Sequence, residues 1–162
     1  MEIAEILAAF RVRRAHYDIY LQANGIQRYT CPGCGFPTLT ARGGFEICVT
    51  CSWEDDGQDD NADSILAELL ATGIEISASN GNTSLTDTRI NIGRILDTNV
   101  ELINGEVDFN SSRVLRTIAF YQQRKEEIGG RITGDERPQD HIWMEWNEVK
   151  KDLLMALVVP KV

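Results

Sequence analysis

Residues 31–51 read CPGCGFPTLTARGGFEICVTC, and this stretch holds all four cysteines of the chain. The cysteines form two C-x-x-C pairs that are separated by thirteen residues. A two-residue gap lets both sulfurs of one turn face the same ion, and two such pairs are typical of a four-thiolate zinc site. We therefore predict one bound zinc ion, with the ligands Cys31, Cys34, Cys48 and Cys51.

Two disulfides, buried cysteines that act as small apolar residues, and a redox-active dithiol are the alternatives for four cysteines so close in the sequence. The first fourteen residues, MEIAEILAAFRVRR, lack the pattern of a secretory signal peptide. A reducing, cytoplasmic location is therefore the expectation, and it favours a metal over disulfides. Because four thiolates close the tetrahedron and leave no position for a substrate, the predicted role of the zinc is structural.

The thirteen residues between the pairs favour a short β-hairpin. Apolar Phe36, Leu39, Phe45 and Ile47 are interleaved with polar residues, and Gly43-Gly44 supplies a turn. A hairpin of this size buries too little apolar surface to be stable alone, whereas a zinc–thiolate site contributes on the order of 10 kcal/mol of folding free energy. The expected module is a metal-stabilised zinc ribbon.

The sequence continues as SWEDDGQDDNAD over residues 52–63 and later reads NGNTSLTDTRIN over residues 80–91. Together with the cysteine stretch, these residues resemble the bacterial cysteine-rich CPCC domain family over about residues 29–96. The resemblance implies a zinc-ribbon-like fold, and some family members are expected beside bacterial toxin genes. This chain has Gly33 where the family's C-P-C-C has a further cysteine, so no role of that thiol is carried over.

An acidic run follows the second cysteine pair. The ten residues from Glu54 to Asp63 include six acidic residues and no basic one, which indicates a contact surface for a cationic partner. A second metal site of irregular geometry and a solvated loop are the alternatives. The predicted partner-binding residues are Trp53, Glu54, Asp55, Asp56, Asp59 and Asp60.

The chain has 162 residues and a formal net charge of −9, which disfavours binding to nucleic acid. No apolar run is long enough to cross a membrane, and no catalytic motif is recognisable. The leading hypothesis is a noncatalytic zinc-binding protein that binds a partner with a basic surface, as an immunity protein that neutralises a bacterial toxin, such as a nuclease, would do. The alternatives are a metal-dependent enzyme that uses residues 54–63 and a nucleic-acid-binding zinc ribbon.

The N-terminal segment predicts an amphipathic helix over residues 2–23 that ends at Asn24-Gly25. Its apolar stripe is interrupted by Arg14. The nearby basic residues point in several directions on a helix, so we expect a solvated face. The predicted stripe is Ile3, Leu7, Phe10, Tyr17 and Leu21, and the basic residues are Arg11, Arg13, Arg14 and His16.

The predicted fold class is α+β, with a small four-cysteine zinc ribbon packed with several α-helices and a second β-hairpin. That hairpin is expected over residues 100–109, around Asn104-Gly105. Further helices are predicted over residues 64–72, after an N-cap at Thr86, and over residues 112–128 and 139–158. The predicted parts are an N-terminal helix (1–25), the zinc-ribbon domain (26–97), and a hairpin with helices (98–162).

Overall fold

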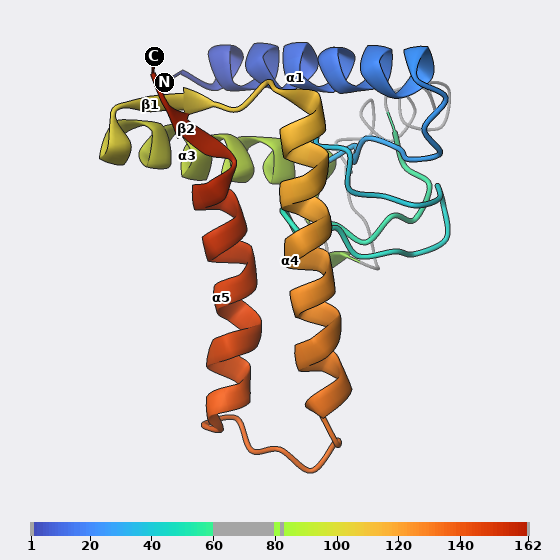
Figure 1. The fold of residues 1–162 in the computed structure, drawn as a ribbon, viewed down its shortest axis with the longest axis vertical. Helices are drawn as coiled ribbons and strands as arrows, with labels where there is room; N and C mark the ends of the chain where they lie inside the picture. Colours follow the sequence, from blue (N-terminus) through green and yellow to red (C-terminus); the bar gives the residue numbers. More distant parts are fainter. Residues whose placement is uncertain (1, 60–79, 82, 162) are drawn as a thin grey trace. The chain divides into compact units, whose positions relative to one another are not determined.

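The computed structural model describes residues 2–59, 80, 81 and 83–161. Within them the protein is α+β, as the sequence predicts, and it forms two compact units, Met1–Asp97 and Thr98–Val162. The predicted helix over residues 64–72 lies outside the described part. The elements in chain order are α1 (Ile3–Ala23), α3 (Leu85–Ile103), β1 (Gly105–Val107), α4 (Ser111–Arg131), α5 (His141–Ala156) and β2 (Val158–Pro160) (Figure 1).

Helix α1 confirms the predicted N-terminal helix, but its buried stripe differs from the prediction. The stripe comprises Ile6, Phe10, Arg13, Tyr17 and Leu21, at spacings of three or four residues. Ile3 is 47 % exposed, because the buried face begins at Ile6. Arg13 lies in the buried stripe between Phe10 and Tyr17. This contradicts the prediction that the basic residues of this helix form a solvated face.

In the first unit, α1 lies beside the part of α3 that precedes Thr98 (Figure 1). A methyl group on Gly93 of α3 would overlap the side chain of Ile6, so the two backbones come close at this point. Ser84, not Thr86, caps the start of α3: its Oγ accepts a hydrogen bond from the Asp87 N–H at 2.9 Å.

The predicted hairpin between the cysteine pairs does not form. Two isolated bridges are present instead, Tyr29↔Leu39 around the first pair and Ile47↔Glu54 around the second. Each cysteine pair folds back on its own flanking residues, so the residues between the pairs do not pair with one another. Ile47 accordingly remains 57 % exposed, whereas Leu39 is buried.

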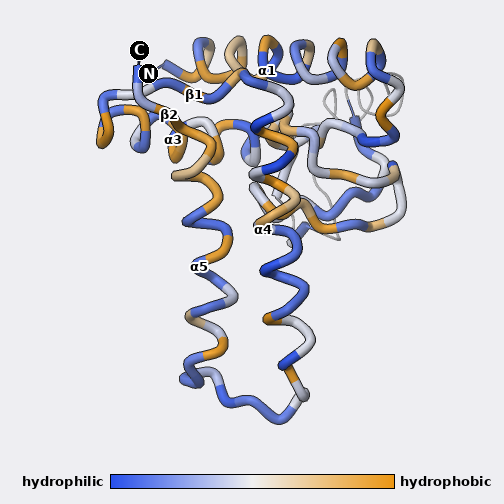
Figure 2. The backbone as a smooth tube through the Cα atoms, in the orientation of Figure 1, coloured by the Kyte–Doolittle hydropathy of each residue, from blue (hydrophilic) through white to orange (hydrophobic). Residues whose placement is uncertain are grey.

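In the second unit, α4 and α5 run side by side in opposite directions (Figure 1). They confirm the helices predicted over residues 112–128 and 139–158. Hydrophobic and hydrophilic residues alternate along both helices, as expected for helices with one buried stripe (Figure 2). None of the helices in the described part combines the length and apolarity needed to cross a bilayer. The buried residues include Val114, Ile118, Ile128, Val149 and Leu153.

The hairpin predicted over residues 100–109 is wrong. Helix α3 continues to Ile103, and Asn104, with a φ of 50°, ends it in the left-handed region. β1 instead pairs antiparallel with β2, with Val107 opposite Val158. The Asn-Gly pair predicts a turn from local sequence alone. In the structure the residues before it continue α3, and the residues after it pair with the distant strand β2.

Candidate metal centre

The two cysteine pairs form matching turns, which we call the first knuckle (residues 31–36) and the second knuckle (residues 48–53). In each, the N–H of the first cysteine donates to the carbonyl five residues later, at 2.9 Å in both. The carbonyl of the same cysteine accepts from the N–H four residues later, at 2.8 Å and 2.9 Å. The residues that donate this second bond, Gly35 and Ser52, have φ values of 78° and 67°. The knuckles are therefore repeats of one backbone conformation.

The knuckles bring the four cysteine sulfurs together, all within 4.8 Å of one another. The Cys31 and Cys51 sulfurs lie 3.6 Å apart, and those of Cys34 and Cys48 lie 3.7 Å apart. A tetrahedron with metal–sulfur bonds of about 2.3 Å has edges of roughly 3.8 Å. Both distances far exceed a disulfide bond of about 2.05 Å. All four cysteines are free, and the cluster can hold a metal ion.

Two buried threonine hydroxyls contact the sulfurs of Cys34 and Cys48. Thr38 Oγ1 lies 3.0 Å from Cys48 Sγ. Thr50 Oγ1 lies 3.0 Å from Cys34 Sγ and 2.9 Å from Cys48 Sγ. Hydroxyls that donate to a metal-bound thiolate offset part of its charge and orient it. The cysteine pattern alone does not indicate either threonine, although each lies within four residues of a ligand cysteine.

Burial disfavours a free thiolate at this cluster. It raises the pKa of the Cys31 thiol well above the ordinary value. At Cys48 burial acts in the same direction, but hydrogen bonds with the other cysteines lower the pKa well below the ordinary value. A bound cation offsets this cost, because it stabilises the negative charge and displaces the protons. The donor set therefore fits a metal ion better than four unligated thiols.

Arg13 brings a buried positive charge to the first knuckle. It is 4 % exposed, and its Nε donates to the Cys34 carbonyl at 2.7 Å. Its guanidinium lies over the Phe36 ring, 5.1 Å from the centroid. Its Nη2 is buried and has no acceptor in the described part of the chain. The spacing of Arg13 from Phe10 and Tyr17 is the sequence signal that could have placed it on the buried stripe.

Two of the described helices, α1 and α3, contact the first knuckle. A methyl group on Gly35 would lie 3.3 Å from the Phe10 carbonyl and from the Arg14 N–H of α1. From α3, Arg89 Nε donates to the Pro32 carbonyl at 2.8 Å. The knuckle is consequently held between two helices, only one of which follows it in the sequence.

Two acidic residues of the run after the second knuckle point inward. Asp55 is fully buried and accepts hydrogen bonds from Arg42 Nε at 2.9 Å and from the Gly43 N–H at 2.7 Å. Asp59 is 7 % exposed, accepts two hydrogen bonds from Arg14, at 2.7 and 2.6 Å, and a third from Arg42 at 2.9 Å. Burial opposes ionisation of Asp55, but these bonds from Arg42 and Gly43 lower its pKa. The acids tie the loop to α1 and to residues 42–43.

The other predicted partner-binding residues differ in exposure. Trp53 is buried, at 1 % exposure, whereas Glu54 and Asp56 are partly exposed. Asp60 lies outside the described residues. Among the residues that are described, the cysteine cluster is the one group of ligand-type side chains close enough together to hold a metal ion. A contact with a partner through this run stays a prediction, and in the described part Glu54 and Asp56 are the predicted acidic residues that are partly exposed.

Residues 29–95 match the model of a family described as "Cysteine-rich CPCC". The match contains all four cysteines and ends within α3, and it confirms the resemblance found in the sequence over that part of the chain. Helix α1, which contacts the first knuckle, lies outside the matched range. No curated protein and no solved structure matches this chain.

Proposed function

We propose that the four cysteines bind one structural zinc ion, and that the domain built around it acts by binding another protein. The main support is that two knuckles of the same conformation place their four cysteine sulfurs within 4.8 Å of one another. A tetrahedral set of four thiolates suits zinc, and it also suits iron in sulfur-rich sites. A closed set of this kind supports a structural role, since it leaves no ligand position for a substrate.

The metal is tested by elemental analysis of the full chain, purified without added metal. We expect about one zinc per chain. The protein solution should be colourless, because Zn²⁺ is a d¹⁰ ion. Iron in the same amount, with visible absorption, would overturn zinc as the metal. Protein that holds no metal and carries two disulfides by mass spectrometry would overturn the site itself.

The surroundings of the cluster support binding rather than catalysis. Asp55 and Asp59 are two of the acids that the alternative, a second metal site in this run, would use as ligands. Both instead form ion pairs, Asp55 with Arg42 and Asp59 with Arg14 and Arg42. The partly exposed Glu54 and Asp56 carry negative charge beside the second knuckle, in a chain of net charge −9. A partner with a basic surface is complementary to this charge. We propose that binding to this partner neutralises a bacterial toxin, and this part of the proposal rests on the family resemblance.

The binding role is tested by co-expressing the chain with the product of the adjacent gene. We expect co-purification and protection from growth arrest, both reduced by a Glu54→Lys/Asp56→Lys double variant that retains its zinc. The matched control is Glu126→Lys/Glu127→Lys, which makes the same charge change at two exposed positions of α4. If the Glu54→Lys/Asp56→Lys variant still protects the cells, these two acids are excluded as the contact. If the product of the adjacent gene does not arrest growth, the immunity role is excluded.

A further inference from the structure

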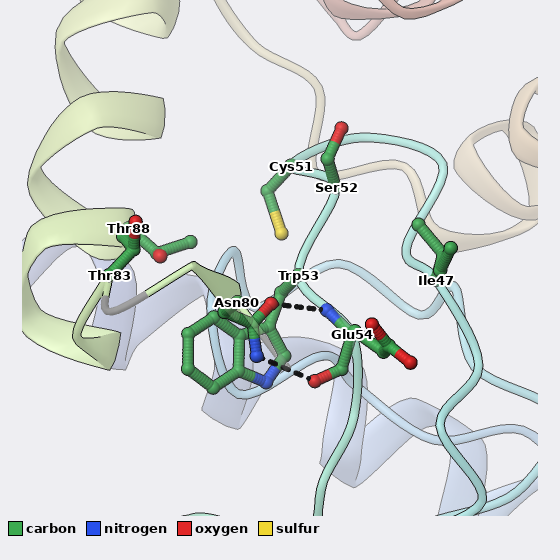
Figure 3. A pocket seen from close by; sticks show the side chains of 8 residues that line it. All are labelled: Ile47, Cys51, Ser52, Trp53, Glu54, Asn80, Thr83 and Thr88. Atoms are coloured by element: carbon green, nitrogen blue, oxygen red, sulfur yellow. Dashed lines mark hydrogen bonds between the residues drawn. The ribbon is translucent and has the colours of Figure 1, made fainter. Parts of the chain in front are cut away.

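The second knuckle borders an open hollow of about 360 Å³ in the first unit. Figure 3 shows the Cys51 side chain between Thr88 on one side and Ile47 on the other, with its sulfur directed toward the middle of the labelled residues. The hollow is lined by Ile47, Cys51, Ser52, Trp53, Glu54, Asn80, Thr83 and Thr88. Of the four cysteines, Cys51 is the one that borders it.

Burial distinguishes Cys51 from the other three cysteines. Cys31 and Cys34 are 0 % exposed and Cys48 is 1 % exposed, whereas Cys51 is partly exposed. Among the four cysteines, Cys51 is therefore the one nearest to solvent, and the hollow borders it.

Hydrogen bonding makes the same distinction. The sulfurs of Cys34 and Cys48 are contacted by threonine hydroxyls, and Cys31 Sγ accepts from the Gly33 N–H at 3.3 Å. In the described part of the chain, Cys51 Sγ has no N–H or O–H donor, and its polar contacts are with the sulfurs of the other cysteines. A hydrogen bond to a thiolate draws charge from the sulfur and lowers its nucleophilicity. Cys51 lacks this protection.

We propose that Cys51 is the reactive thiolate of the centre, and that the hollow admits a small, soft carbon electrophile to it. The Cys51 sulfur uses a lone pair to form a bond to the electrophilic carbon, and the leaving group departs with its own electron pair. The product is a neutral thioether, which weakens the hold of this ligand on the metal. The centre would in this way lose metal in response to electrophiles. This inference rests on the proposed metal site.

The test uses the full chain loaded with zinc and treated with a limiting amount of iodoacetamide, the labelled positions being read by peptide mass spectrometry. We expect Cys51 to be alkylated about tenfold faster than any other cysteine, the factor set by one hydrogen bond to a charged sulfur. Zinc release, followed with a chromophoric chelator, should keep pace with Cys51 labelling. Equal or faster labelling of another cysteine in zinc-loaded protein would overturn the inference, while absence of zinc at the start would overturn the metal site.

A variant tests the route. Thr83 is partly exposed at the hollow, and Thr83→Trp should fill it and slow the alkylation of Cys51 severalfold without changing the zinc content. Ala119→Trp, on the exposed surface of α4, is the control and should leave the rate unchanged. The same Cys51 rate in both zinc-loaded variants would exclude the hollow as the route. The order of labelling in the unsubstituted chain decides the identity of the reactive thiolate whether or not Thr83→Trp folds.

Discussion

The two knuckles share one backbone conformation but differ in what surrounds them. Every residue from 31 to 36 is buried, and α1 and α3 both contact the first knuckle. In the second knuckle, Cys51 is partly exposed and Ser52 is exposed beside the hollow. The left-handed position is a glycine in the first and a serine in the second. The spacing of the cysteines sets the ligand geometry, whereas the packing around each knuckle sets its stability and its access to solvent.

The largest expected effect comes from removing one ligand from each knuckle in turn. Cys34→Ser should abolish tight metal binding and unfold the first unit, since the metal supplies on the order of 10 kcal/mol and the buried position cannot recruit water as a replacement. Cys51→Ser should retain a weakly bound zinc, because water can enter through the hollow and complete the coordination. Zinc affinity by chelator competition, with NMR of the first unit, measures both variants.

Signals from α4 and α5 serve as the internal control, because the second unit contains no cysteine. They should be unchanged in both variants. Equal loss of zinc from Cys34→Ser and Cys51→Ser would show that the difference in surroundings has no consequence for metal binding.

The next effect tests the contact between the first knuckle and α1. Gly35→Ala should destabilise the first unit by about 2–4 kcal/mol, because a side chain there is strained at φ 78° and also lies 3.3 Å from the α1 backbone. Gly57→Ala is the matched control: its φ is 89°, but a methyl group there meets no atom within 4 Å. It should cost only about 1 kcal/mol, the cost of the backbone strain. Denaturant unfolding measures both, and equal costs would contradict a packing role for α1.

The parts of this site that the sequence predicts are the local ones. A C-x-x-C pair constrains its own turn, so the four ligands follow from spacing, and the helices follow from their apolar periodicity. The partners of Asp55 and Asp59 are not local: Arg14 and Arg42 come from other segments, and no sequence pattern pairs these two arginines with the two acids. The pairing of β1 with β2 likewise joins residues far apart in the sequence. The hairpin predicted over residues 100–109 is wrong because its pairing depends on tertiary packing, which a local turn signal does not report.

A smaller effect tests the buried charge beside the first knuckle. Arg13→Met keeps an unbranched apolar side chain over Phe36 but removes the positive charge and the bond to the Cys34 carbonyl. We expect zinc affinity to fall by at least about tenfold, as is usual when a residue that supports a metal ligand is replaced. Arg11→Met, on the exposed face of the same helix, should leave zinc affinity unchanged. Equal zinc affinities in Arg13→Met and Arg11→Met would show that Arg13 contributes only to packing and not to metal binding.

The smallest effect concerns the one place where the second knuckle is less well suited to its conformation than the first. Ser52 has a φ of 67° at the position that Gly35 fills in the first knuckle. A residue with a β-carbon is strained in this region, and glycine is not, so Ser52→Gly should stabilise the first unit by about 0.5–1 kcal/mol in denaturant unfolding. Ser52→Ala removes the same hydroxyl but keeps the β-carbon, and it should give no such gain. A gain in both variants would assign the effect to the hydroxyl. A loss in Ser52→Gly would mean that the added freedom of the unfolded chain outweighs the relief of strain, and that the two knuckles are equally well adapted.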